Sequence, residues 1–420
     1  MKAPAEASTG GAGQGPGSAP MPHGGPGVAA HPGLASAVRP PPADDARPRP
    51  HVAFVARHVW PVLSGARDIA FVGGAEVQQT VQMRALRRAG CRISVLVRDH
   101  GQPAQVDCDG IAVHRIPEVA GRGWPGLRFV YPRMTDIVAL LRRVDADLVF
   151  VQTASEEVAS AAVWARLARR PFVFAGASDM DFVLGPLPGM PARHAAAYRW
   201  GLRMADAVIV QNVAQQALLR RHFQRHGVLI QNGYEEPGAR PGRPDGPVLW
   251  AATVKPLKRP ELFVDLARRL PQRQFLMVGG PGATADGPAT FERVAQLARG
   301  LPNLRLTGHV PYAEVGRHFD GAALVLNTSD YEGLPNTFMQ AWLRGIPTLS
   351  FVRPESAPGC SGTIACDGLD DMAARVEALC ARPTAWTAAS LACRRHFETH
   401  HTVQAAVQRY LEVFDGVLGR

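Results

Sequence analysis

The segment 328–340 joins a carboxylate to the start of an expected helix. Glu332 and Gly333 follow the apolar run 324–327, which is expected to be a buried strand. Gly333 permits close backbone approach, and the next backbone N–H groups have no partner within the helix. These N–H groups belong to Leu334, Asn336 and Thr337. A helix N-terminus of this kind suits a diphosphate, and Gln340 lies two turns from Glu332, so both can face one ligand.

A second segment, 253–260, is basic and follows the expected strand 248–252. It carries Thr253, Lys255 and Lys258 at the carboxyl end of that strand, where cations can neutralise phosphates. Both segments also have an ordinary interpretation. Glu332 would then be a solvated cap of a strand-to-helix turn, and the lysines would belong to a basic surface loop.

In the first half of the chain, Gly73 and Gly74 open the expected helix 75–89. The pattern is neither Gly-x-Gly-x-x-Gly nor Gly-x4-Gly-Lys-Ser/Thr, which excludes the dinucleotide fingerprint and the phosphate loop of nucleotide triphosphatases. The turn still lets a ligand or a facing domain approach closely. Asp179 and Asp181 form an Asp-x-Asp triplet like those that hold a metal on a nucleotide diphosphate. Such triplets arise easily by chance, so we expect Asp179 and Asp181, together with Gly73, on the acceptor side, and we expect no metal.

Apolar runs of strand length alternate with amphipathic stretches throughout residues 51–420. The expected strands are 51–56, 91–97, 148–151, 172–175, 207–210, 228–230, 248–252, 274–278, 304–306, 324–327 and 348–351. The expected helices are 75–89, 156–168, 192–205, 214–225, 260–270, 312–319, 336–344, 370–381 and 403–418. This alternation predicts an α/β fold with two Rossmann-like, doubly wound domains facing across a cleft, and ligands in such sheets bind beyond the strand ends.

The composition separates the chain into expected segments. Residues 1–50 hold 9 Gly, 11 Pro and 11 Ala and lack Ile, Phe, Tyr and Trp, which predicts a disordered tail. The domains are expected at 51–238 and 248–400, with a Gly- and Pro-rich linker at 239–247. Residues 401–420 form a separate C-terminal helix.

The composition also excludes several classes of protein. With 46% apolar and 20% charged residues the 420-residue chain can build two cores. No apolar run approaches the roughly 18 residues that span a bilayer. The six cysteines form no Cys-x-x-Cys pair, so we expect reduced thiols and no structural zinc. The net charge of +10 is spread over many segments without aromatic interleaving, which argues against a nucleic-acid partner.

Six motifs occur in a familiar order from residue 51 to the C-terminus. They are GGAEVQ at 73–78, ADAVIVQN at 205–212, LIQNGYE at 229–235, VLWAATVKPLKRPELF at 248–263, LTGHVP at 306–311 and YEGLPNTFMQAWLRGIPTL at 331–349. Together they resemble the GT-B glycosyltransferases, in particular family 4 of retaining enzymes with a Glu-x7-Glu segment.

The resemblance implies a role for each matching residue. Glu332 would hold hydroxyls of the donor sugar, and Lys258 with the N–H groups near 334–337 would hold the diphosphate; these two side chains are the expected catalytic residues. Gly308, His309 and Val310 would line the base. Gly74 would let the first domain close on the donor, and the helix 401–420 would cross back to that domain.

Three positions depart from the family pattern. Gln340 stands where the second Glu normally binds the ribose diol, Thr253 stands where an Arg is expected, and Gln152 stands near an expected His. Lys255 could supply the missing charge of the Arg, although as a point charge and not as a fork. These departures bear on rate and donor preference more than on fold.

The resemblance implies transfer of a sugar from a nucleotide diphosphate sugar to a glycan or lipid-linked acceptor in surface polysaccharide or glycolipid biosynthesis. No metal or other cofactor is expected to be required, because cations and N–H dipoles take its place. Basic helices favour a cytoplasmic enzyme that meets an anionic membrane peripherally. The departures leave open a catalytically weak relative that acts as a binding or partner subunit. Epimerisation of a nucleotide sugar is a third hypothesis, but it needs acid–base residues that the sequence does not identify.

Overall fold

The computed structural model describes residues 48–65, 73–118, 122, 128–187, 190–282, 286–355 and 360–420. Residues from Arg49 onward form one compact unit, and all of the account below concerns that unit. Of the expected tail 1–50, all but the last three residues lie outside the described residues.

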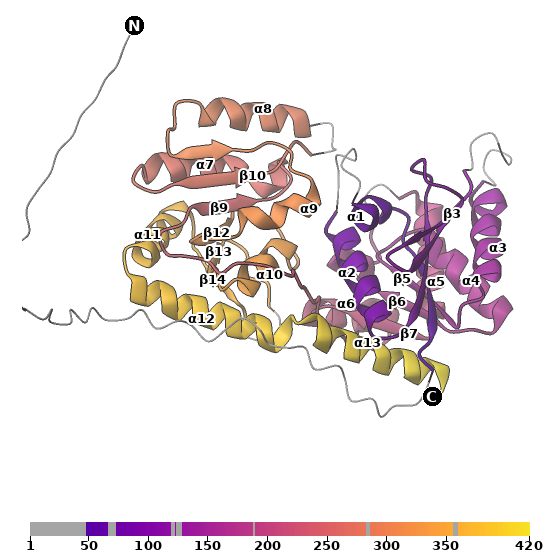
Figure 1. The fold of residues 1–420 in the computed structure, drawn as a ribbon. Helices are drawn as coiled ribbons and strands as arrows, with labels where there is room; N and C mark the ends of the chain where they lie inside the picture. Colours follow the sequence, from indigo (N-terminus) through magenta and orange to yellow (C-terminus); the bar gives the residue numbers. More distant parts are fainter. Residues whose placement is uncertain are drawn as a thin grey trace, which may run out of the picture. The chain divides into compact units, whose positions relative to one another are not determined.

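The first lobe is an eight-stranded sheet with its helices. Its strand order is β3-β4-β2-β1-β5-β6-β7-β8, and every pairing is parallel except that of β3 with β4 (Figure 1). The strands are β1 (His51–Val55), β2 (Arg92–Val97), β3 (Gln105–Cys108), β4 (Ile111–Arg115), β5 (Leu148–Gln152), β6 (Phe172–Ala175), β7 (Ala207–Val210) and β8 (Val228–Leu229). The helices are α1 (Trp60–Ser64), α2 (Gly74–Arg88), the π-helix η1 (Phe129–Met134), α3 (Thr135–Val144), α4 (Glu157–Ala168), the 3-10 helix η2 (Asp179–Phe182), α5 (Ala192–Met204) and α6 (Val213–Phe223).

The second lobe is a six-stranded parallel sheet in the order β11-β10-β9-β12-β13-β14. The strands are β9 (Val248–Ala251), β10 (Phe275–Val278), β11 (Leu304–Leu306), β12 (Leu324–Asn327), β13 (Thr348–Ser350) and β14 (Thr363–Ala365). The helical segments are η3 (Pro256–Lys258), α7 (Pro260–Arg269), α8 (Gly287–Ala298), α9 (Tyr312–Val315), η4 (Gly316–His318), α10 (Asn336–Leu343), α11 (Leu369–Cys380) and α12 (Pro383–His400).

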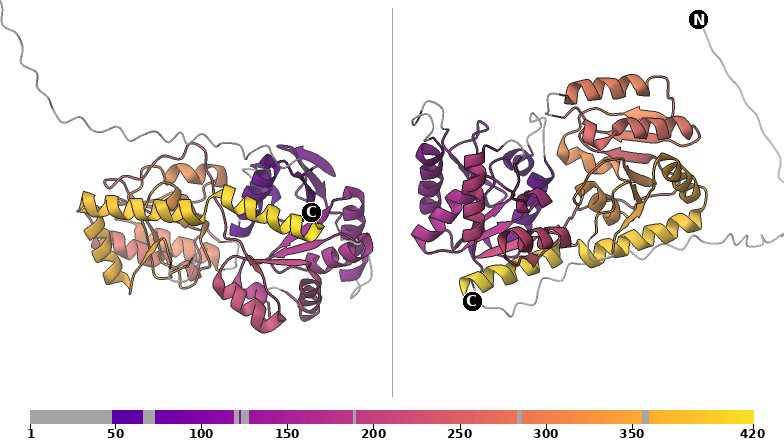
Figure 2. Two further views of the ribbon diagram at one scale, coloured as in Figure 1. Left: turned by 90° about the horizontal axis from the view of Figure 1, so that it is seen from below. Right: turned by 180° about the vertical axis from the view of Figure 1, so that it is seen from behind.

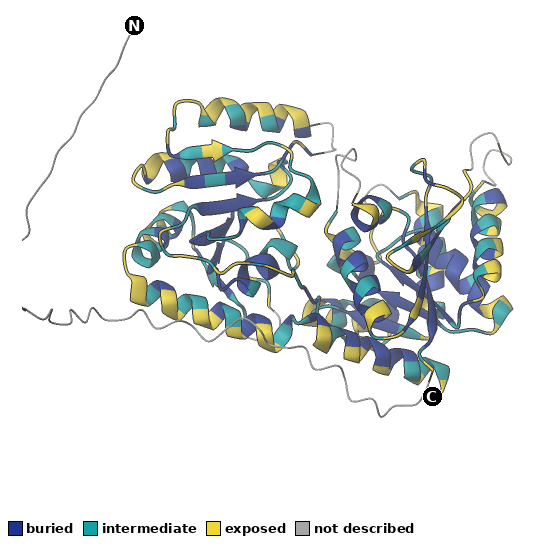
Figure 3. Cartoon of the chain, viewed as in Figure 1, coloured by how far each residue is buried: buried dark blue, intermediate teal, exposed yellow. Residues whose placement is uncertain are grey.

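The central strands are buried on both faces, which explains why they are continuous apolar runs and not alternating ones. β1, β5 and β6 consist wholly of buried residues, and Figure 3 shows the strands buried between helices whose outer faces are exposed. Helices thus cover both sides of each sheet, as parallel strands with crossover helices require.

The last helix, α13 (Val403–Leu418), packs on the first lobe. Its buried residues, including Val407, Tyr410 and Phe414, belong to the same core cluster as Phe54 of β1 and Phe150 of β5. Figure 2 shows α12 and α13 following each other end to end, with α12 along the second lobe and α13 along the first. Tyr234 and Thr402 bridge near this junction, so the chain passes between the lobes twice at one place.

The expected α/β fold with two Rossmann-like sheets is confirmed. The strands 172–175, 207–210, 304–306 and 324–327 and the helix 403–418 have the expected bounds. The expected single helix 312–319 is instead α9 followed by the 3-10 turn η4, which begins at Gly316, a residue that weakens helices. The expectations did not include the helices α3, α8 and α12 or the antiparallel β3–β4 pair.

Among the described residues, no helix combines the length and the apolar character needed to cross a membrane.

Candidate active site

A cavity of about 620 Å³ lies between the two lobes, which is within the range of small-molecule sites. It is lined by residues of the first lobe, including α2, and by the loops that follow strands β9, β10, β11 and β12 of the second. The expected residues that line it are Gly73, Gly74, Thr253, Lys255, Lys258, His309, Val310, Glu332, Gly333, Leu334, Asn336, Thr337 and Gln340. A site beyond the strand ends is where doubly wound folds bind ligands.

Lys258 and Glu332 form an ion pair at the wall of this cavity. Only 17% of the lysine side chain and 12% of the glutamate side chain are exposed. The same carboxylate oxygen, Oε1, also accepts hydrogen bonds from Asn327 Nδ2 at 3.2 Å and Ser329 Oγ at 2.7 Å. Glu332 is therefore held by three donors, while its second oxygen has no part in these contacts.

The backbone of Lys258 is fixed by its neighbours. It ends the short turn η3, and its carbonyl accepts from Thr328 Oγ1 at 2.7 Å. Thr328 in turn accepts from Trp250 Nε1 of β9 at 3.1 Å. Since β9 and β12 are neighbouring strands, this network ties the Lys258 turn to the Glu332 turn. The cation is thus positioned before any ligand arrives, which reduces the entropy lost on binding.

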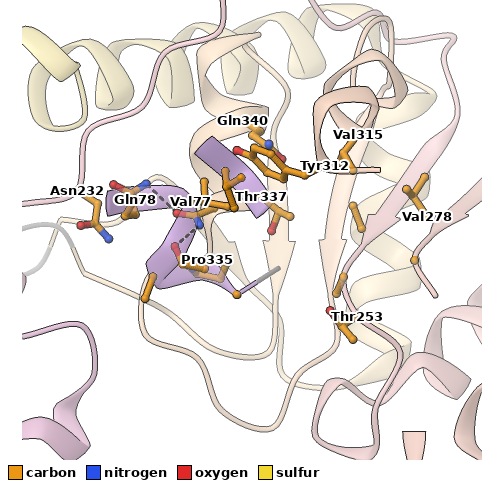
Figure 4. Close-up of a pocket in the computed structure, with 18 of the residues that line it drawn as sticks. Val77, Gln78, Asn232, Thr253, Val278, Tyr312, Val315, Pro335, Thr337 and Gln340 are labelled. Atoms are coloured by element: carbon orange, nitrogen blue, oxygen red, sulfur yellow. Dashed lines mark hydrogen bonds between the residues drawn. The ribbon is translucent and has the colours of Figure 1, made fainter. Parts of the chain in front are cut away.

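The N-terminus of α10 opens onto the cavity and meets the N-terminus of α2 there. Asn336, the first residue of α10, accepts from Gln78 Nε2 at 2.8 Å and donates from Nδ2 to the Gly74 carbonyl at 3.0 Å (Figure 4). A Cβ on Gly74 would lie 3.3 Å from Asn336 Nδ2, so glycine suits this close approach. Two helix dipoles therefore direct their positive ends toward one space, which favours a bound anion.

Gln340 is buried at the floor of the cavity with 3% of its surface exposed. Its Nε2 donates to Tyr234 Oη at 2.8 Å, and that hydroxyl lies 3.3 Å from Tyr312 Oη and 3.3 Å from Glu236 Oε2. Burial raises the pKa of Tyr234 and raises that of Tyr312 well above the ordinary value, so both phenols stay protonated. Sequence reasoning assigned no role to either tyrosine, although Tyr234 lies in the quoted LIQNGYE motif.

Gln152 ends β5 and also lines the cavity, with 3% of its surface exposed. Its Oε1 has no hydrogen-bond partner among the described residues. A buried acceptor left unsatisfied costs about 1–3 kcal/mol, so a donor from a ligand or a water molecule is expected at this point.

The expected base-lining residues His309 and Val310 lie beside the glycine pair that follows β10. A Cβ on Gly280 would come within 3.0 Å of the His309 Cα, so the loop that follows β10 packs directly against the loop that follows β11 and carries His309. Gly308 is not among the lining residues. It has φ of 72° and forms a bridge with Gly279, so it shapes the turn that presents His309.

The two aspartates of the Asp-x-Asp triplet do not line the cavity. Asp181 is buried and accepts from the backbone N–H groups of Ala154, Ala177 and Ser178 at 2.7–2.9 Å. Burial raises the pKa of its carboxyl. This side chain is used to fold its own loop. Asp179 instead accepts from Tyr331 Oη at 3.1 Å, a contact between the lobes beside Glu332.

Two family models match the chain. The model described as a glycosyl transferase 4-like domain matches residues 73–233, and the model described as glycosyl transferases group 1 matches residues 247–382. No match was found among proteins of curated function.

Several solved structures share the fold at low sequence identity. Sucrose-phosphate synthase from Thermosynechococcus elongatus is 16% identical with a TM-score of 0.69, covering 88% of this chain and 100% of that one. HepE from Anabaena in complex with UDP is 15% identical with a TM-score of 0.62, covering 87% and 100%. The catalytic domain of starch synthase IV from Arabidopsis thaliana, bound to ADP and acarbose, is 14% identical with a TM-score of 0.61, covering 89% and 100%.

Proposed function

Since the chain is a glycosyltransferase with the GT-B fold, we propose that it moves a sugar from a nucleotide diphosphate sugar to a glycan or lipid-linked acceptor with retention at the anomeric carbon. The observation that carries this proposal is the Lys258–Glu332 pair beside the N-terminus of α10 in the interlobe cavity. One wall of the cavity therefore carries a cation, a carboxylate that can accept from hydroxyls, and the positive end of a helix dipole that can hold an anion.

The donor is proposed to bind with each part against a different element. The diphosphate would lie against Lys258 and the N–H groups that begin α10, since charge-assisted hydrogen bonds hold phosphates strongly. The sugar hydroxyls would donate to Glu332, and the base would lie along His309 and Val310. The ribose would reach Gln340. The complexes of HepE with UDP and of starch synthase IV with ADP support a nucleoside diphosphate as the ligand class.

The proposed reaction leaves the new bond on the same face as the old one. The bond between the anomeric carbon and the donor oxygen breaks with its electron pair on the diphosphate. An acceptor oxygen bonds to that carbon from the same face, and its proton passes to a phosphate oxygen. The protein supplies positioning and stabilises the departing charge through Lys258 and the α10 dipole. No metal is required in this scheme.

The acceptor is proposed to be part of a surface polysaccharide or glycolipid, met at the inner face of a membrane. Support comes from α5, which carries Arg193, Arg199 and Arg203 together with Trp200, a residue with 44% of its surface exposed. Basic residues beside an exposed indole suit an anionic interface. Asp179, which lies at a contact between the lobes, would take part on the acceptor side.

A catalytically weak relative that acts as a binding or partner subunit is the second candidate. The observation that favours it is the hydrogen bond from Gln340 Nε2 to Tyr234 Oη, which uses the donor half of the amide and leaves a neutral Oε1 where the family pattern has a carboxylate. The neutral Thr253 in the cavity wall points the same way.

The test is a thermal-shift screen of the full chain against UDP, GDP and ADP and their sugars, with and without EDTA. A ligand at 100 times its Kd stabilises the native state by about 2.7 kcal/mol. We expect one nucleotide to raise Tm, without an effect of EDTA, and to do so far less in Lys258→Ala. Arg142→Ala, an exposed cation of α3, is the matched control and should keep the full shift.

The outcomes separate the two candidates. A shift that accompanies transfer to an acceptor or slow hydrolysis of the donor supports the enzyme. A shift without turnover of any donor favours the binding subunit. No shift with any nucleotide would overturn both, and an equal shift in Lys258→Ala would remove Lys258 from the diphosphate site.

A further inference from the structure

A cysteine and two histidines meet where α12 ends, outside the lining of the interlobe cavity. Cys360 precedes β14, and His396 and His400 lie in the last turns of α12. Cys360 Sγ is 3.6 Å from His396 Nδ1 and 3.6 Å from His400 Nε2. The three potential ligand atoms all lie within 4.8 Å of one another. None of them lines the cavity or takes part in the proposed transfer.

The local structure holds these side chains in place. Residues four apart on a helix share a face, which brings both imidazoles to the same side of α12. His396 is buried with 8% exposed, and its ring packs edge-on against Trp342 of α10 at 4.9 Å between centroids. A Cβ on Gly362 would lie 2.6 Å from His396 Cδ2, so the glycine two residues after Cys360 lets the loop reach the ring.

The two sulfur-to-nitrogen distances match those around a tetrahedral ion. Zinc binds sulfur at about 2.3 Å and imidazole nitrogen at about 2.0–2.1 Å in tetrahedral geometry, which places a sulfur about 3.6 Å from each nitrogen. The two observed Sγ to nitrogen distances are both 3.6 Å. We propose that Cys360, His396 and His400 form a zinc site.

The ligand types select the metal. A thiolate with two imidazoles suits zinc, whereas magnesium and calcium prefer oxygen ligands. Three protein ligands among the described residues leave one tetrahedral position for water or an external ligand. The expectation of no structural zinc rested on cysteine pairs, and this cluster has one cysteine with histidines 36 and 40 positions later.

The ion would tie the connection between β13 and β14 to the end of α12. The next residue, His401, packs against Trp342 and contacts the Asn232 carbonyl through Nδ1 at 2.9 Å. The zinc would therefore stabilise the place where the chain leaves the second lobe. The proposed ion would link these two segments, and none of its three ligands lines the cavity that holds Lys258.

The experiment uses the full-length protein after treatment with a chelator, with Co²⁺ as the spectroscopic probe. We expect a single equivalent of Co²⁺ to give a thiolate-to-cobalt charge-transfer band with the visible bands of a tetrahedral ion, and Zn²⁺ to displace both. Cys360→Ser should lose the charge-transfer band. Cys380→Ser, on α11, is the matched control and should keep it.

A second variant guards against misfolding of the first. His400 is partly exposed, and His400→Ala should fold while its affinity for Zn²⁺ falls by more than about 100-fold, since loss of an outer-shell partner alone costs 10–100-fold. Zn²⁺ should also raise the Tm of the unaltered chain more than that of either ligand variant. Absence of the band in the unaltered chain, or its persistence in Cys360→Ser, would overturn the proposal and leave a thiol hydrogen-bonded to imidazole.

Discussion

Gln340→Glu restores the residue type that the family resemblance implies, and the structure predicts that it destabilises the unliganded protein. Gln340 donates from Nε2 to Tyr234 Oη, and Tyr234 donates to Glu236. A carboxylate at position 340 cannot donate. The Tyr234 proton must then turn toward the new carboxylate, and its contact with Glu236 is lost.

The magnitude follows from burial. Position 340 is 3% exposed, and full burial of a carboxyl raises its pKa by up to about 3–5 units. The hydrogen bond from Tyr234 offsets part of this, so we expect a net rise of about 1–2 units, at 1.36 kcal/mol each. With the lost Tyr234–Glu236 bond the cost at pH 7 is about 2–3 kcal/mol. At roughly 2–4 °C per kcal/mol, Tm falls by about 4–12 °C.

The stability of the Gln340→Glu variant should fall relative to that of the unaltered chain as pH rises. A carboxyl whose folded pKa is raised binds more protons in the native state than in the unfolded state, so it destabilises as pH rises above about 4.3. The variant and the unaltered chain should therefore agree in Tm near pH 4.5 and diverge toward pH 7. The assay is a thermal melt at several pH values. Gln404→Glu, at an exposed position of α13, is the control and should show no such divergence.

A bound nucleotide should offset the destabilisation caused by Gln340→Glu if position 340 contacts the ribose, because two ribose hydroxyls can then donate to the carboxylate. The Tm shift with the preferred nucleotide should be larger in Gln340→Glu than in the unaltered chain. A Gln340→Glu protein that melts at or above the temperature of the unaltered chain at pH 7, without ligand, would refute the burial argument.

Three further predictions concern other parts of the molecule. Glu332→Gln should lower kcat/KM for sugar transfer by about 10²–10³-fold. It also leaves the largely buried Lys258 ammonium without its counter-charge, so Tm should fall, and initial rates measured well below Tm, together with melts, test this. Gly74→Val should raise KM for the donor by about tenfold or more, since its Cβ would lie 3.3 Å from Asn336 Nδ2; an unchanged KM would count against closure there. Burial and Arg92 lower the pKa of His51 to about 4, so the unfolded chain binds a proton that the folded chain refuses between pH 6.5 and 4. Stability should fall by up to about 3 kcal/mol as pH falls through this window, and urea unfolding should show a smaller fall in His51→Gln.

The sequence predicts the Glu332 turn well because its determinants are local. An apolar run ends at Asn327, a glycine follows Glu332, and Pro335 precedes the helix, which begins at Asn336 as expected. The contact of Glu332 with Lys258 is not local. It exists because β9 and β12 are paired, although they are separated along the chain by β10 and β11. Periodicity does not reveal strand order, so only the family resemblance assigned both residues to one donor site, and their direct contact was not predicted.

The role of Asp181 and the helix α12 were not predicted from the sequence. Ser178 to Asp181 is a Ser-x-x-Asp capping pattern, and the structure has the capping box, which explains why Asp181 is committed to backbone N–H groups. Helix α12 was not predicted because only four of its 18 residues are buried, although Trp386, Cys393 and Phe397 have the seven- and four-residue spacing of one helix face. The zinc ligands were missed for the same reason, since two of the three lie on that helix.

The position of α13 constrains the order in which the molecule can be completed during synthesis. Val403, Val407 and Phe414 contribute to the core that also contains Phe54 and Phe150, yet they follow every strand of both lobes along the chain. The second lobe has all of its described strands and helices once His400 has left the ribosome, whereas one face of the first sheet waits for α13. Although domains generally fold from the N-terminus onward, here the lobe that begins first is finished last, and a chain that ends before Val403 keeps a bare apolar face on it.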